Sequence, residues 1–236
     1  MKKLLQLSLA LALFATATAQ PVNDPNVEVR TTGSFHGINV SSSFDVYISQ
    51  DAQEALAVSA ADTKYRDNIR TEVVDGILRI TYNSSGGWGG GNKKLRAYIS
   101  VKQLDKLTIS GACDVFIKGT LKADDLQISQ SGASDLKGSS FDVQRLTISL
   151  SGASDMTIGG KAARLKVDAS GASDFKGYDL TTEYCDADAS GASDIHITVN
   201  KELNVKASGA SDVKYKGEAL IRDLKTSGAS GVSRGR

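Results

Sequence analysis

The sequence has little of what an enzyme active site or a conventional large globular core requires. Its 236 residues include only two prolines, two cysteines and two histidines, and aromatic residues make up 6%. A histidine-based catalytic centre or metal site therefore has few residues to draw on. No metal-ligand spacing, P-loop or dinucleotide-binding fingerprint is present either. We therefore expect a protein without cofactor or enzymatic activity.

An excess of charge of one sign is also missing. The 28 lysines and arginines balance 27 aspartates and glutamates. Nucleic-acid-binding surfaces and polybasic membrane surfaces need a strong positive field, so neither partner is expected.

Long apolar runs are confined to the N-terminus. Leu4 to Phe14 follows Lys2 and Lys3 and precedes the small residues Ala17-Thr18-Ala19. This order predicts a signal peptide over residues 1–19, removed after Ala19. A membrane anchor is the alternative, but the apolar run is shorter than the roughly 20 residues that span a bilayer. We expect an exported protein of the periplasm, outer-membrane surface or extracellular space, with no transmembrane segment after signal removal.

The sequence is rich in one repeated pentapeptide, Ser-Gly-Ala-Ser-Asp. Successive copies begin 18 to 21 residues apart. A period near 20 residues predicts a solenoid, in which each unit buries itself against its neighbours. The copies begin at Ser110 (with Cys113 in the fourth place), Ser131, Ser151, Ser170, Ser190, Ser208 and, in altered form, Ser227.

Strand patterns flank each pentapeptide. An apolar residue follows the aspartate, and apolar and polar residues alternate before the motif, as in Leu146-Thr147-Ile148-Ser149-Leu150. Alternation of this kind indicates half-buried strands. We predict an all-β fold: a parallel β-helix (β-solenoid) over residues 106–232, with rungs of about 20 residues and a tail at 233–236. Each rung has two or three strands with glycine corners, and rungs stack about 4.8 Å apart.

The region before the solenoid is β-rich but less regular. Residues 20–34 contain both prolines and are predicted to be a flexible lead-in. Residues 35–105 are predicted to form irregular β-coils that cap the first rung. Within them, Asp75-Gly76 indicates a hairpin turn, and Ala60 to Asn68 has room for one short helical turn.

The solenoid register places six aspartates in a ladder at one corner. Two interpretations are open. Each carboxylate accepts hydrogen bonds from corner N–H groups, as in Asx-turns, or the ladder holds calcium ions. The nine-residue repeat of calcium-binding solenoids is absent, which favours the structural interpretation. The six residues are Asp114, Asp135, Asp155, Asp174, Asp194 and Asp212.

Other candidate sites are few. Trp88 lies in the glycine-rich stretch 84–92, which is either a flexible hairpin loop or an exposed binding tip. His36 and His196 are the two histidines, and His196 falls at an outward rung position, where we expect a solvated side chain. Rungs this short leave no evident catalytic pocket.

The two cysteines are expected to remain unpaired. Cys113 and Cys185 fall three to four rungs apart in the predicted register, which corresponds to about 14–19 Å. A disulfide requires Cα atoms within about 7 Å of each other.

The chain resembles the head GIN domain family, exported bacterial proteins described as autotransporter adhesin heads. The resemblance rests on Phe35-His36-Gly37-Ile38-Asn39-Val40, on Phe44-Asp45-Val46-Tyr47-Ile48, on the Asp75-Gly76 hairpin with Leu78-Arg79-Ile80, and on the rungs. It covers Phe35 to the end of the chain. It implies a β-solenoid with an adhesive role and supplies no catalytic residues.

Two functional hypotheses follow. The first is a non-enzymatic, adhesin-like or envelope-structural solenoid that presents a repetitive polar surface to an extracellular or envelope ligand, a glycan or a protein. The alternative is a carbohydrate-active or calcium-binding solenoid. A row of exposed aromatic residues would favour the alternative, but Phe116 and Tyr215 are isolated in the repeats. The sequence does not specify the oligomeric state.

Overall fold

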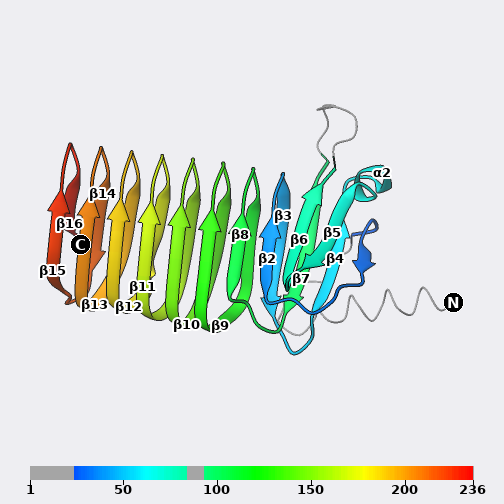
Figure 1. Cartoon of the computed structure of the whole chain (residues 1–236), viewed down its shortest axis with the longest axis horizontal. Coiled ribbons are helices and arrows are strands. Elements are labelled where there is room, and N and C mark those ends of the chain that lie inside the picture. The colour runs from blue at the N-terminus through cyan, green and yellow to red at the C-terminus, as the bar shows by residue number, and fades with distance from the viewer. Residues whose placement is uncertain (1–23, 84–92, 236) are drawn as a thin grey trace.

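The structure is a computed structural model that describes residues 24–83 and 93–235. The predicted signal peptide, residues 1–19, and Trp88 lie outside these residues. Almost all of the regular structure in the described residues is β-strand, stacked into one elongated solenoid (Figure 1). None of the helices in these two ranges is long and apolar enough to cross a membrane.

Five long strands form the regular part of the solenoid, and each runs from one Ser-Gly-Ala-Ser corner to the next. Every strand pairs in parallel with the strands before and after it, so that Asp135 lies between Asp114 and Asp155. The predicted parallel β-solenoid is thus confirmed, together with its register. The long strands are β9 (Asp114–Gln130), β10 (Asp135–Leu150), β11 (Asp155–Ala169), β12 (Asp174–Ala189) and β13 (Asp194–Ala207).

Each long strand bends twice, which gives a coil three sides. In β10, alternation of inward and outward side chains is interrupted at Ser139-Ser140 and at Gln144-Arg145, where two successive side chains point outward. Residues 135–138, 141–143 and 146–150 therefore form sides 1, 2 and 3 of this coil. Equivalent residues of the other coils line up on the same three sides through strand pairing.

The corner geometry explains the pentapeptide. Gly152 has a φ of +80°, and a Cβ there would lie 2.4 Å from the carbonyl oxygen of Gly132 in the preceding coil. A side chain is therefore excluded by backbone conformation and by close stacking. Ala153 N–H donates to the same Gly132 oxygen at 2.8 Å. The buried Ser154 hydroxyl donates to Ser151 O at 2.8 Å, which closes the corner.

The two cysteines occupy inward positions of this register. Cys185 lies in an apolar column between Leu165 and Leu203. Cys113 replaces the corner serine, and its thiol donates to Ser110 O at 3.4 Å. Both thiols are free and buried, with β10 and β11 between them, and burial raises the pKa of each. Both are therefore poor nucleophiles in the folded chain.

Two coils precede the long strands, and their stacking order differs from their order in the chain. The strand β2 lies between β6 and β8, and β3 lies between β7 and β9. The chain thus forms a first coil with β2 and β3. It then adds β6 and β7 on the side away from the repeats, and continues with β8 on the side that faces the repeats. The strands are β2 (Gly37–Val40), β3 (Phe44–Gln50), β6 (Ile77–Tyr82), β7 (Leu95–Val101) and β8 (Lys106–Ile109).

Antiparallel strands close the N-terminal end, at the right of Figure 1. There, β4 (Ala55–Ser59) pairs with β7, β1 (Glu28–Arg30) pairs with β4, and β5 (Ile69–Val74) pairs with β6. The predicted hairpin turn joins β5 and β6, and the predicted helical turn is α2 (Thr63–Arg66). In contrast to the predicted flexible lead-in, residues 28–30 are part of the sheet.

The C-terminal end has no comparable closure within residues 24–83 and 93–235. The last strands are β14 (Asp212–Lys216), β15 (Leu220–Thr226) and β16 (Gly231–Arg234). There, β15 pairs with β13 and β16 with β14, and neither has a strand on its other side. Leu220 and Leu224 of β15 are 55% and 50% exposed.

Candidate binding face

Side 1 carries an uninterrupted column of aspartates. Strand pairing aligns the six predicted residues and adds Asp45 of β3, which pairs with Asp114. Asp45 could not be predicted from the pentapeptide because its corner is degenerate. Ser42 takes the corner glycine's place with a φ of 93° and stacks against Gly111. The serine-rich segment before Asp45-Val46 is the sequence feature that could have predicted this corner.

A second column lies beside the aspartates, two residues further along each strand. Lys176 reaches Asp155 at 3.1 Å and Asp174 at 3.4 Å, and the hydrogen bond to Asp155 raises the pKa of Lys176. Lys176 and Lys137, which pairs with Asp135, reduce the repulsion between stacked carboxylates. From the first coil of repeats onward, the second column contains Phe116, Lys137, Thr157, Lys176, His196 and Lys214.

The Asx-turn interpretation of the aspartates is wrong. In the repeat corners, the N–H groups of the first serine, the alanine and the aspartate donate to backbone carbonyls of the preceding coil, as Asp155 N does to Ser134 O at 3.1 Å. The backbone ladder thus occupies these donors, so the carboxylates extend outward. Their side chains are roughly 40–50% exposed where they meet Lys137 and Lys176.

Phe116 is not isolated, in contrast to the prediction. Its ring stacks on Tyr47 with centroids 5.2 Å apart, and Tyr47 stacks on Tyr98 at 5.3 Å. The Lys118 ammonium lies over both Tyr47 and Phe116. Because the rings cover each other's faces, they pack successive coils together and do not form a flat platform for a sugar ring.

The two histidines have structural surroundings. His196 occupies the predicted outward column but stacks on Tyr178, with centroids 4.9 Å apart and rings nearly parallel. Burial, followed by the charge of Lys214, lowers the pKa of His196. The side chain is therefore packed and neutral near pH 7, whereas solvation was expected.

His36 joins three segments of the N-terminal coils. Its Nδ1 lies 2.9 Å from both carboxylate oxygens of Asp105, in the segment between β7 and β8. The other side of the ring packs on Gly76, where a Cβ would be 2.5 Å from Nε2. The His36 N–H also donates to Gly76 O at 2.9 Å. This histidine–aspartate pair fastens the hairpin turn to the crossing segment.

Two depressions in the described surface are candidate ligand sites. One, of about 220 Å³, lies on side 3 and is lined by Lys166, Asp168, Asp186, Asn204 and Lys206, among others. The second, of about 550 Å³, lies beside His36. Both are open to solvent, unlike the enclosed pockets that bind small molecules. Among the residues that the structure describes, no three or more His, Cys, Asp or Glu side chains cluster as metal ligands would.

A polar network fixes the lead-in to the N-terminal end. Asp24 accepts hydrogen bonds from the Ser59 hydroxyl at 2.6 Å, from Arg96 at 3.0 Å and from Asn26 N at 3.1 Å. Burial by itself would raise the pKa of Asp24, but these partners outweigh it and lower that pKa. Asp24 is thus ionised and holds the chain just before β1 against β4 and β7.

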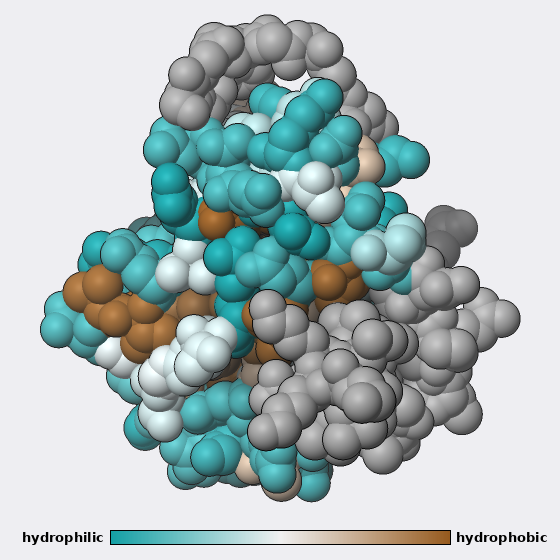
Figure 2. All heavy atoms as spheres, turned by 90° about the vertical axis from the view of Figure 1, so that its right-hand side faces the viewer, coloured by the Kyte–Doolittle hydropathy of each residue, from teal (hydrophilic) through white to brown (hydrophobic). Residues whose placement is uncertain are grey.

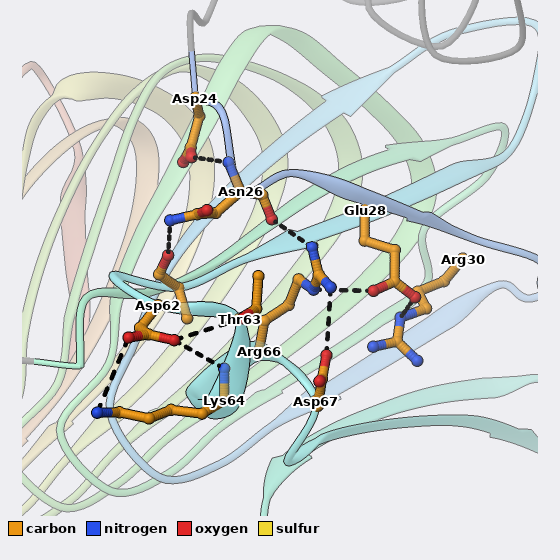
Figure 3. Close-up of polar contacts among 10 residues, drawn as sticks. Asp24, Asn26, Glu28, Arg30, Asp62, Thr63, Lys64, Arg66 and Asp67 are labelled. Atoms are coloured by element: carbon orange, nitrogen blue, oxygen red, sulfur yellow. Dashed lines mark hydrogen bonds and ion pairs between the residues drawn. The ribbon is translucent and has the colours of Figure 1, made fainter. Parts of the chain in front are cut away.

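Arg66 of α2 completes this network (Figure 3). Its guanidinium lies 2.8 Å from Glu28, donates to Asn26 O at 3.3 Å, and pairs with Asp67 at 3.2 Å. Asp62 caps α2 by accepting from Lys64 N. Figure 2 views this end directly: the described surface is mainly hydrophilic, and a hydrophobic patch is visible at the left of the view.

The family assignment follows from residues 34–219, which match the profile described as "Putative auto-transporter adhesin, head GIN domain". The chain belongs to the head GIN domain family. This confirms the resemblance inferred from the segment that contains Gly37-Ile38-Asn39 and from the rungs. No curated protein matches the chain.

Solved structures share the head GIN fold. A protein from Bacteroides fragilis described as "a putative adhesin" is 22% identical, with a TM-score of 0.84 over 92% of this chain and 99% of that one. A "putative adhesin" from Parabacteroides merdae is 16% identical, with a TM-score of 0.68 over 91% and 98%. A "putative lipid binding protein" from Parabacteroides distasonis is 19% identical, with a TM-score of 0.67 over 91% and 98%. At these identities, the similarity establishes the fold.

Proposed function

We propose that this head GIN protein is exported and acts as a non-enzymatic, adhesin-like binding surface of the cell envelope. The observation that supports the proposal is side 1, where one aspartate and one second-column residue recur in register on successive coils. A catalytic site is a single arrangement, whereas on this face an aspartate recurs on every coil of repeats and a lysine on every second coil. Repetition suits a multivalent ligand, a glycan or a protein, because weak identical contacts combine through effective concentration.

The mixed charge of side 1 predicts how it binds. Lysines of the second column alternate with carboxylates, and both are substantially exposed. Contacts to such groups are weak individually and are screened by salt within about 10 Å at 0.1 M. Binding should thus be modest per site, stronger for polymeric ligands, and salt-sensitive.

The test is a screen of glycans and matrix proteins with the purified mature chain, followed by two triple variants. Lys137→Gln, Lys176→Gln and Lys214→Gln together should weaken binding of any ligand found. The matched control, Lys122→Gln, Lys161→Gln and Lys201→Gln, removes the same charge from other exposed positions and should leave binding unchanged. Equal effects of the two triples would show that side 1 is not the binding face.

Absence of turnover is a separate part of the proposal. A hydrolase and lyase screen should be negative, and cells lacking the protein should lose attachment or envelope integrity without losing growth on a particular polysaccharide. Reproducible cleavage of a defined glycan, abolished by one Asp→Asn change in the ladder, would favour an enzyme.

A further inference from the structure

The C-terminal coil presents an unpaired strand edge with apolar residues at its core positions. In β15, Ile221 pairs with the inward Leu203, and Leu224 pairs with the inward Val205. Leu224 is nevertheless 50% exposed, since no described strand covers this end. Open edges of this kind pair readily with another strand unless something blocks them.

We propose that the occupant of this edge is a second copy of the same chain, which pairs its β15 antiparallel to the first across a two-fold axis. Two such chains meet tail to tail and form one longer solenoid with antiparallel N-terminal strands at each extremity. The inference is independent of the ligand of side 1.

A bulge in β15 selects the register of this pairing. Leu203 and Asn204 are consecutive in β13, but their partners Ile221 and Asp223 are separated by Arg222. Arg222 and Asp223 therefore both point outward, while Ile221 and Leu224 on either side point inward. Consider a two-fold axis that passes between Arg222 and Asp223. It pairs outward residues with outward residues and inward residues with inward residues, as antiparallel pairing requires.

The side chains match in this register. Arg222 lies opposite Asp223 of the second copy, and the two-fold axis repeats this opposite-charge pair. Ile221 lies opposite Leu224 of the second copy, so both apolar residues gain a neighbour at the core position. Opposite charges and apolar residues facing each other across strands both stabilise pairing.

The ion pairs that Arg222 and Asp223 already make within the chain do not prevent their pairing across the two-fold axis. Arg222 contacts Glu202 at 2.9 Å and Asp223 contacts Lys225 at 2.9 Å, with side chains 41–66% exposed. Exposed ion pairs contribute little to stability, so they are easily rearranged. Arg234 folds back to donate to Gly217 O and thus does not project from the end as a repelling charge.

The test measures the mass of the full mature chain in solution over a range of concentrations, by light scattering coupled to gel filtration or by analytical ultracentrifugation. Wild type should form a dimer that dissociates on dilution. Arg222→Asp and Asp223→Arg place like charges opposite each other, so each should raise the dimer dissociation constant by about tenfold or more. Arg145→Asp makes the same charge change at the bend before side 3 of β10, away from the C-terminal edge, and should leave the dimer intact.

Complementation makes the test specific for the register. An equimolar mixture of the two single variants should dimerise, because one chain then carries two acidic and the other two basic residues at the axis. The double variant Arg222→Asp/Asp223→Arg should also dimerise. Three outcomes would overturn the proposal: a wild type that stays monomeric, single variants that dimerise as wild type does, and variants that fail to complement. Growth beyond dimers would instead indicate head-to-tail stacking, which also contradicts it.

Discussion

At each end of the solenoid, the core positions of the last coil lack a further coil to cover them, and the two ends differ in what covers these positions. At the N-terminal end, β1, β4 and β5 run antiparallel to their neighbours and α2 adds an ion-paired network. At the C-terminal end, the last parallel strands stop with their core positions partly open. One inward column makes the contrast measurable: near its N-terminal end Leu78 is paired with Val73 of β5 and is 0% exposed, whereas at its C-terminal end Leu224 has no described strand beyond it and is 50% exposed. A reversal of strand direction thus accompanies closure of the solenoid.

The largest effect should come from truncating the ends of that column. Leu78→Ala should lower the free energy of unfolding by about 2–5 kcal/mol, because it leaves a cavity beneath the N-terminal cap. Leu224→Ala, measured at concentrations where the chain is monomeric, should cost less than about 1 kcal/mol, since half of that side chain already contacts water. Denaturant unfolding followed by circular dichroism measures both. Similar losses would mean that the two ends are equally closed.

Asp24 tests the polar part of the N-terminal closure. Asp24→Asn should cost about 1–3 kcal/mol, because the charge that faces Arg96 is lost and the Ser59 hydroxyl keeps a weaker partner. The loss should concentrate in β1 and β4, where hydrogen exchange would accelerate. Asp223→Asn, which alters an exposed pair with Lys225 at the other end, is the control and should leave exchange in both strands unchanged.

Low pH should destabilise the N-terminal strands because it protonates the Asp24 carboxylate. The pKa of Asp24 in the folded chain is below its ordinary value of 3.8. Its contribution is therefore fully present above about pH 4 and is lost as the pH falls through the lowered folded pKa. Exchange in β1, recorded at falling pH and corrected for intrinsic rates, should accelerate in wild type. In Asp24→Asn it should be fast throughout, and a parallel response of both proteins would remove Asp24 as the cause.

The buried thiols report which end opens first. Cys185 lies near the open C-terminal end, whereas Cys113 lies in the corner before β9. In Arg222→Asp, which keeps the C-terminal edge free, a thiol reagent should label Cys185 several-fold faster than Cys113. Mass spectrometry of proteolytic fragments resolves the two sites. Faster labelling of Cys113 would reverse the proposed order of opening.

The smallest effect is expected from chelation. The aspartate column spans both halves of the molecule, and Lys137 and Lys176 pair with its carboxylates and reduce the repulsion between them. A chelator should leave the melting temperature unchanged, whereas ions bound only to the native state would raise it measurably. A clear decrease with chelator would assign the ladder to calcium.

The repeats could be predicted from the sequence, but the start of the solenoid could not. The pentapeptide spacing sets the register because each corner glycine and serine contacts its equivalent in the next coil, as at Gly132 and Gly152. Pairing of β2 with β6 and β8 follows no repeat and joins segments about 40 and 70 residues apart. The stack of Tyr47 with Tyr98 and Phe116 depends on that same order, which local patterns do not encode.

The candidate face was predicted in part for a related reason. Alternation placed Lys137, Lys176 and Lys214 outward beside the aspartates, as found. The role of the corner N–H groups was mistaken, because a single rung does not show that the preceding coil's carbonyls accept from them. We expected His196 to be solvated because no sequence pattern indicates that Tyr178 stacks on it.

The strict order of coils from β9 onward makes the length of the molecule an adjustable quantity. Strand pairing links each of these coils only to the coil before and the coil after it. Duplicating about 20 residues between two corners would insert one coil, lengthen the solenoid by about 4.8 Å and leave both ends as they are. The same duplication upstream of β8 would separate strands that interleave. Recombination can therefore change the reach of such a protein without rebuilding either terminus.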